Sequence, residues 1–131
     1  MAIMSKIYLQ VKDVLDNNID PIDDKISEEY LAGDEDTISV VRETYISEFE
    51  KASSLIKDFL KQKDYQKILD LVHRIKGVSL YIGSKILYDI SSYICDCIRK
   101  SIPCDLEIEI ITSLNDIVLQ KLEERISWKV Y

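Results

Sequence analysis

Apolar residues recur every three or four positions along most of the chain, which is the spacing of one face of an α-helix. Between residues 35 and 61 these positions are Ile38, Val41, Tyr45, Phe49, Ala52, Ile56 and Phe59. Between 64 and 82 they are Ile68, Leu71, Val72, Ile75, Val78 and Ile82, with Ser79 on the same side. Residues 84–100 carry Leu87, Ile90, Ile94 and Ile98, and residues 105–127 carry Ile108, Ile111, Leu114, Ile117, Val118 and Leu122. The pattern predicts four long amphipathic helices.

Residues that start or stop helices separate the four segments. Asp34 and Ser84 stand where an N-cap side chain would accept hydrogen bonds from the first free amides of a helix. Gly83 follows the second stripe as a C-cap, Pro103 ends the third helix, and Asp105 opens the last. Because the connections are short, consecutive helices should run antiparallel, as in an up-and-down four-helix bundle.

The first 33 residues form a separate N-terminal segment. Ile7, Val11, Val14 and Leu15 follow helical spacing between residues 5 and 17, although residues 7–11 also fit a short alternating strand. The run from Asn17 to Pro21 breaks the chain, and a short helix over residues 23–31 is predicted before Gly33. We expect this segment to cap one end of the bundle.

Length and composition agree with one helical domain. The chain has 131 residues, of which 47% are hydrophobic, with only three Gly and two Pro. We therefore predict an all-α fold: a single domain over residues 1–131, with an antiparallel four-helix bundle over 34–128 and the extension over 1–33. No run approaches the roughly 18 apolar residues that would cross a membrane, and the start lacks the apolar core of a signal peptide. We expect a cytoplasmic protein without a membrane partner.

The three cysteines give no sign of a metal or disulfide site. Cys95 and Cys97 are two apart on a predicted helix, so their side chains diverge, and Cys104 follows a proline. The chain has one histidine, and no zinc-like ligand spacing occurs. We expect small packing residues or free thiols, with no metal and no cofactor bound by the chain.

The only histidine, His73, carries the clearest chemical signal. At about 100° per residue, the apolar stripe of its helix lies opposite the imidazole, so the ring should face solvent. Lys76 and Gly77 lie one turn away on the same surface, and Leu69 and Leu80 flank it. A lone surface histidine usually has no function, and a lone helical glycine often serves close packing. Because glycine costs about 1 kcal/mol relative to alanine in a helix, the combination instead favours a nucleophile that another protein must approach.

The segment resembles the histidine phosphotransfer (HPt) domains of two-component phosphorelays. The family motif is His-x-(Leu/Ile)-Lys-Gly, then a small residue and an apolar-Gly pair; these places are filled by His73, Ile75, Lys76, Gly77, Ser79, Ile82 and Gly83. The resemblance covers about residues 28–126. Cys95 stands where many members have Gln or Glu beside the histidine, and Arg99, one turn later, matches a basic residue of some members.

The resemblance implies a phosphoryl carrier rather than an enzyme. Phosphohistidine at His73 would relay the group between the aspartates of receiver domains, with Lys76 balancing its charge. The docking surface for the receiver would be formed by Leu69, Arg74, Gly77, Leu80 and Arg99. The divalent ion that such transfer requires would sit on the receiver, and a sensor or hybrid histidine kinase would be a further partner. Two alternatives remain: a helical adaptor that binds receivers without being phosphorylated, and the phosphoacceptor module of a chemotaxis-type kinase.

The charge distribution fits an acidic partner. Residues 57–85 hold seven Lys/Arg against three Asp, a balance of +4, which leaves −11 on the rest of a chain whose net charge is −7. A basic region around His73 would steer the chain toward the acidic pocket of a receiver, although alternating charge on a solvated surface is the ordinary explanation. The acidity elsewhere disfavours nucleic acid as a partner. We expect a monomer.

Overall fold

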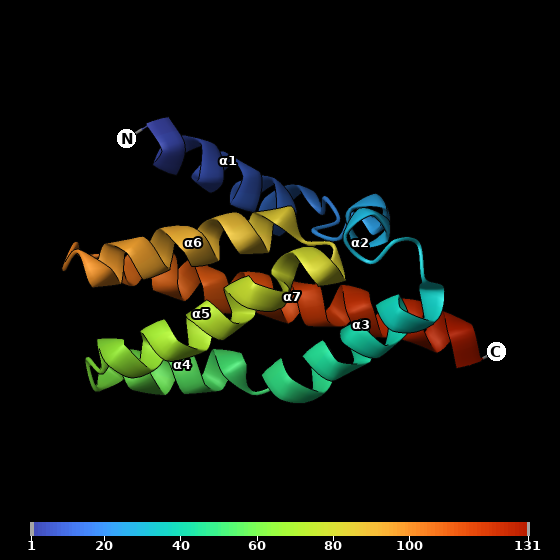
Figure 1. Cartoon of the computed structure of the whole chain (residues 1–131). Coiled ribbons are helices and arrows are strands. Elements are labelled where there is room, and N and C mark those ends of the chain that lie inside the picture. The colour runs from blue at the N-terminus through green and yellow to red at the C-terminus, as the bar shows by residue number, and fades with distance from the viewer. Residues whose placement is uncertain (1, 131) are drawn as a thin grey trace.

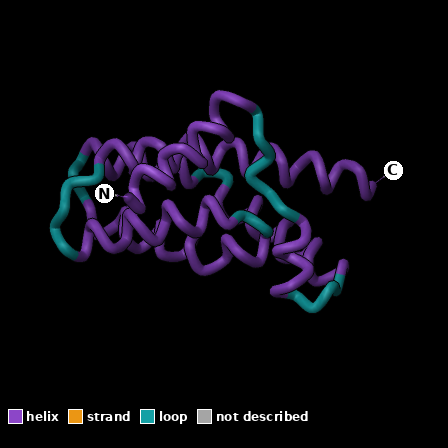
Figure 2. The backbone as a smooth tube through the Cα atoms, turned by 90° about the horizontal axis from the view of Figure 1, so that it is seen from above, coloured by secondary structure: helices purple, strands orange, loops and turns teal. Residues whose placement is uncertain are grey.

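Seven α-helices make up this computed structural model, which describes the backbone of residues 2–130 and the side chains of residues 6–126. They are α1 (Ala2–Asn17), α2 (Asp24–Tyr30), α3 (Glu35–Phe49), α4 (Ala52–Lys61), α5 (Tyr65–Ile82), α6 (Lys85–Arg99) and α7 (Asp105–Val130) (Figure 1). Seen from above, the described chain is helices joined by loops, with no strand (Figure 2). The all-α prediction is confirmed, and the strand alternative for residues 7–11 is wrong.

The helices from α3 onward form the predicted bundle. The pair α3 and α4 lies along one edge, and α5, α6 and α7 follow in turn, each running back beside the one before (Figure 1). α5 packs against α6 on one side and against α3 and α4 on the other, whereas α7 closes the bundle against α4, α3 and α6. Every long helix therefore contributes one face to a shared interior.

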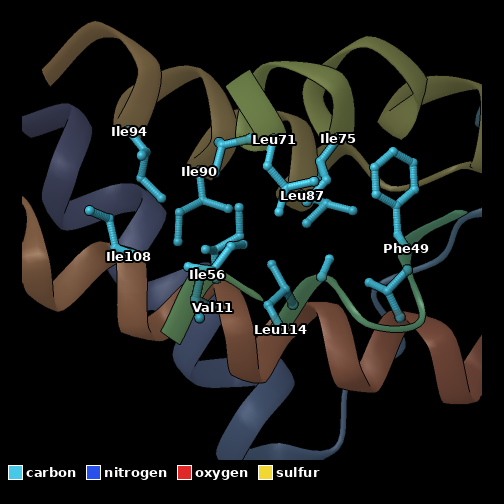
Figure 3. Packing of buried hydrophobic residues seen from close by; sticks show 14 of the residues in the cluster. Val11, Phe49, Ile56, Leu71, Ile75, Leu87, Ile90, Ile94, Ile108 and Leu114 are labelled. Carbon is cyan, nitrogen blue, oxygen red and sulfur yellow. The ribbon is translucent and has the colours of Figure 1, made fainter. Parts of the chain in front are cut away.

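The predicted apolar stripes meet in that interior. Side chains from α4, α5, α6 and α7 interdigitate in Figure 3, among them Ile56, Ile75, Ile90 and Leu114. Five predicted inward positions are only half-buried and pack around the edge of the core: Val41, Phe59, Val78, Ile98 and Ile117. Burying one large aliphatic side chain contributes roughly 1.5–3 kcal/mol, so this shared core supplies most of the driving force for folding.

The helix predicted over residues 35–61 is not continuous. It breaks at Glu50 and Lys51, between α3 and α4. At the break the carbonyl of Phe49 accepts a hydrogen bond of 3.3 Å from Nδ2 of Asn115, a buried residue of α7. Oδ1 of the same amide accepts a hydrogen bond from the hydroxyl of Tyr45. A polar group of another helix thus binds the backbone where the helix changes direction, and apolar spacing alone gives no sign of it.

The N-terminal segment also differs from the prediction. Instead of capping one end of the bundle, α1 lies along its side, against α6 and α7 (Figure 1). Ile7, Val11 and Val14 are buried there, whereas Leu15, predicted on the same stripe, is 37% exposed. It is α2 that packs near an end of the bundle, against α5 and α3.

The helix that carries His73 has well-defined ends. Asp64 is its N-cap, with a side chain that accepts a hydrogen bond of 3.2 Å from the amide of Lys67. Gly83 is its C-cap in the left-handed region, at φ +97°, where a side chain is strained. A Cβ atom at Gly83 would lie 2.7 Å from the carbonyl oxygen of Asp23. Only glycine suits this position, because the chain entering α2 passes directly over it.

Arg42 of α3 ties the same helix end to the extension. Its guanidinium is almost completely buried and donates to the carbonyl of Ile82 from Nε at 3.3 Å and from Nη2 at 3.2 Å. Nη2 also lies 3.1 Å from Oγ of Ser27 and 2.8 Å from Oδ1 of Asp24, both in α2. The last carbonyl of α5 is thereby satisfied, and α2, α3 and α5 are joined at one point.

No described helix is long and apolar enough to cross a membrane.

Candidate functional site

His73 lies in the middle of α5 and is exposed, while its neighbours Val72 and Ile75 are completely buried. The apolar stripe therefore turns the imidazole outward, as the helical spacing predicts. One polar contact reaches the ring: Nη2 of Arg99 lies 3.5 Å from Nδ1. Among the described side chains, no hydrogen bond or ion pair involves Nε2, so this nitrogen can bond to a partner.

Arg99 reaches the ring from the last turn of α6, the helix that packs most extensively beside α5. Cys95, one turn earlier on α6, is completely buried. Burial raises the pKa of the Cys95 thiol, while the nearby charges of Arg99 and Lys76 act in the opposite direction. At this site the polar contact to the imidazole is thus made by residue 99 and not by residue 95.

Gly77 is exposed, and a Cβ atom built on it would meet nothing within 4 Å outside its own helix turn. Close packing therefore does not explain a glycine there, because a side chain would fit. The surface next to His73 is open where a partner would have to approach.

The two cations that flank His73 on α5 point away from it to either side. Lys76 is half-buried, and its Nζ lies over the ring of Tyr88 on α6, 5.8 Å from the centroid. Arg74 is directed toward α3, where it lies 3.6 Å from a carboxylate oxygen of Glu48 and stacks over Phe49 at 5.3 Å. Of the three predicted basic residues, Arg99 is the one whose guanidinium lies at the imidazole.

The apolar flanks are less exposed than the sequence suggests. Leu69 and Leu80 are half-buried and contribute only part of their surface. Sequence reasoning missed a more exposed pair nearby: Tyr81 at the end of α5 is 41% exposed, and Tyr30 of α2 is 51% exposed. Their rings meet edge to face with centroids 5.9 Å apart. Helical spacing could not join them, because they lie on helices that are far apart in sequence.

The thiols are free and buried, as predicted. Burial, with the neighbouring Cys97, raises the pKa of Cys104 to about 12. Over the side chains that the structure describes, no group of three or more His, Cys, Asp or Glu is placed to hold a metal ion.

Comparison with protein families gives a match over most of the bundle. The family model described as Hpt domain matches residues 40–126, about two thirds of the chain. This range contains α4, α5 and α6 completely, together with His73, Lys76, Gly77 and Arg99. No curated protein and no solved structure shows a significant match.

Proposed function

The chain belongs to the Hpt domain family, and we propose that it carries a phosphoryl group on His73 between the aspartates of two receiver domains. Members of this family are phosphocarrier modules of phosphorelays that interact with receiver domains, and they are not catalysts in their own right. The observation that carries the proposal is the exposed position of His73, the only histidine of the chain, with no hydrogen bond to Nε2 among the described side chains.

The proposed chemistry is a reversible transfer. A neutral imidazole attacks phosphorus with the lone pair of Nε2; the N–P bond forms while the bond from phosphorus to the aspartyl oxygen breaks, and the electron pair leaves with the carboxylate. The acceptor aspartate reverses these steps. Positive charge near the ring favours the phosphoryl group, and Lys76, one turn from His73 on α5, is the residue that would supply it. To do so, Lys76 would have to leave the ring of Tyr88.

The partner supplies what this chain does not. The divalent ion would be held by the carboxylates of the receiver, and the phosphoryl group would originate from a sensor or hybrid histidine kinase. The surface around His73 would dock the receiver through Leu69, Gly77 and Leu80, with cations at its edges. We further propose that the chain acts in the cytoplasm as a monomer and without a cofactor of its own.

Phosphate incorporation tests this proposal directly. The protein and the His73→Gln variant are each incubated with a phosphorylated receiver domain and, separately, with phosphoramidate, and intact mass is measured before and after acid treatment. An acid-labile adduct of one phosphoryl group on the wild type, absent from a folded His73→Gln variant, supports the carrier role. Labelling by an ATP-bound kinase domain but by no phosphorylated receiver would favour the phosphoacceptor module. Receiver binding without any adduct would favour the adaptor.

A further inference from the structure

Nη2 of Arg99 lies close to Nδ1 of His73, and this contact bears on where the imidazole can hold a proton. A guanidinium has five N–H donors and no acceptor. Nδ1, at 3.5 Å from Nη2 of Arg99, can therefore meet it favourably only as an acceptor, with its lone pair free of a proton. A proton on Nδ1 would face both the positive charge and the N–H groups of Arg99.

Proton occupancy of Nδ1 matters for both directions of the proposed transfer. Nε2 can attack phosphorus only if its lone pair is free, so a neutral ring must then carry its proton on Nδ1. In the reverse direction, a proton on Nδ1 lets the ring leave phosphorus as a neutral imidazole when the N–P bond breaks. For hydrolysis, the water oxygen bonds to phosphorus, the N–P electron pair returns to Nε2, and the surplus proton of the water passes to solvent.

We propose that Arg99 is a positioning residue that keeps the proton off Nδ1 of His73 and so slows gain and loss of the phosphoryl group when no receiver is bound. The inference rests on the proposed function. Arg99 is exposed at the end of α6, so its guanidinium can be drawn away by the carboxylates of an acidic partner. Docking then removes the restriction, and transfer to the partner is favoured over loss to water.

The nearest alternative is that Arg99 only balances phosphoryl charge, and this predicts a different result. If it did, removing Arg99 would slow phosphorylation by a small anionic donor. If it controls the proton, removal accelerates the same reaction. The sign of the change therefore separates the two roles.

The variants are Arg99→Gln, whose carbonyl oxygen can accept from a protonated Nδ1, and Arg99→Lys, which keeps a cationic donor. Lys67→Gln is the control, because Lys67 is also an exposed cation of α5 but contacts Asp64 and Phe59. In phosphoramidate, Arg99→Gln should be phosphorylated about two- to fivefold faster than wild type. After the donor is removed, the phosphorylated variant should lose its phosphoryl group faster than phosphorylated wild type by a similar factor. Arg99→Lys and Lys67→Gln should stay close to wild type. Slower or unchanged phosphorylation of Arg99→Gln would overturn the inference.

A second readout does not depend on phosphorylation. Because His73 is the only histidine, its two ring nitrogens give unambiguous ¹⁵N resonances that report which one holds the proton in the neutral ring. The fraction protonated on Nδ1 should be higher in Arg99→Gln than in wild type and unchanged in Lys67→Gln. An identical fraction in all three proteins would refute the role of Arg99 even if phosphate is incorporated. A shift in tautomer without any adduct would instead contradict the proposed function alone.

Discussion

The guanidinium of Arg42 donates two hydrogen bonds to the carbonyl of Ile82, the last residue of the helix that carries His73. Through Asp24 and Ser27 the same side chain reaches α2, which precedes the range matched by the family model. The N-terminal segment therefore helps to fix the end of α5. We call this cluster of Arg42, Asp24, Ser27 and Ile82 the Arg42 joint. His73 lies more than two helical turns from it, so a change in the joint can alter stability without altering the reactivity of the imidazole.

Arg42→Met should destabilise the fold by about 1–3 kcal/mol, because it leaves the buried carbonyl of Ile82 and the hydroxyl of Ser27 without their donor. Urea unfolding followed by circular dichroism measures this free energy. Arg74→Met is the control, since Arg74 is exposed and its partner Glu48 is also exposed. Equal stability of the two variants would show that the Arg42 joint contributes nothing beyond a surface ion pair.

Asp24 gives the same joint a pH dependence. Partial burial would raise the pKa of its carboxyl, but hydrogen bonds and charges from Arg125 and Arg42 outweigh burial and lower it. A lowered pKa in the folded state means that the ionised carboxylate stabilises the protein above the ordinary aspartate value, and that this contribution is lost as pH falls through the folded-state pKa. Wild type should thus exceed Asp24→Asn in unfolding free energy at pH 7 by up to about 1 kcal/mol, with the gap narrowing below about pH 4.

Thermal or urea unfolding between pH 3 and 7 measures that gap. Asp58→Asn serves as control, because Asp58 is exposed on α4 and no ion pair to it occurs among the described side chains. A gap that stays constant with pH, or that widens in acid, would contradict the sign of the shift at Asp24.

Gly83→Ala should be strongly destabilising. The residue has φ +97°, which costs an L-residue roughly 1–2 kcal/mol, and its new Cβ would also collide with the carbonyl of Asp23 at 2.7 Å. Gly77→Ala is a matched control, because the same change at an open helical position should be neutral or stabilise by up to about 1 kcal/mol. If both variants lower the unfolding midpoint to the same extent, the positive φ and close contact at Gly83 do not explain its requirement for glycine.

Local sequence features predicted the histidine helix almost completely. Gly83 and Ser84 mark helix ends through contacts within a few residues, and both were predicted as caps; Asp64, predicted as the first residue of the helix, is its N-cap. The break after Phe49 could not be recognised in this way, because Asn115, which binds its carbonyl, is 66 residues further along the chain. Helical spacing shows which face is buried but not which polar group of another helix will meet it.

The same limit applies to the site. The apolar stripe determines that His73 faces outward, and its motif identified Lys76 and Gly77 as neighbours. Whether a nearby cation reaches the imidazole depends on how α5 and α6 are aligned, and this alignment brings Arg99 to Nδ1 across 26 residues. Arg74, adjacent in sequence, is instead directed to α3 by Glu48 and Phe49. The position of α1 likewise depends on its packing against α6 and α7. The apolar spacing within α1 is compatible both with this position and with the predicted cap at the end of the bundle.

Gly77→Gln should separate docking from chemistry. Because the position is open, the longer side chain should leave helix content unchanged, but it would occupy the surface through which a receiver approaches His73. Transfer from a phosphorylated receiver should fall by tenfold or more, which corresponds to about 1.4 kcal/mol. Phosphorylation by phosphoramidate should change much less, because this donor is small. Equal loss with both donors would mean that the variant disturbs the imidazole itself and not the approach of a partner.

Tyr30→Ser tests whether the docking surface extends onto the N-terminal segment. Tyr30 and Tyr81 form an exposed aromatic pair beyond the end of the surface that contains Gly77 and Leu80, and exposed aromatic side chains are enriched where partners bind. Removing the ring should weaken receiver binding about three- to tenfold by calorimetry, in the range of a moderate contact in an interface. Phosphoramidate labelling should not change, because the tyrosine does not contact His73. Tyr8→Ser provides the control, because Tyr8 is a similarly exposed tyrosine on α1. If both substitutions leave affinity at the wild-type value, the receiver does not reach α2, and docking is confined to the bundle helices around His73.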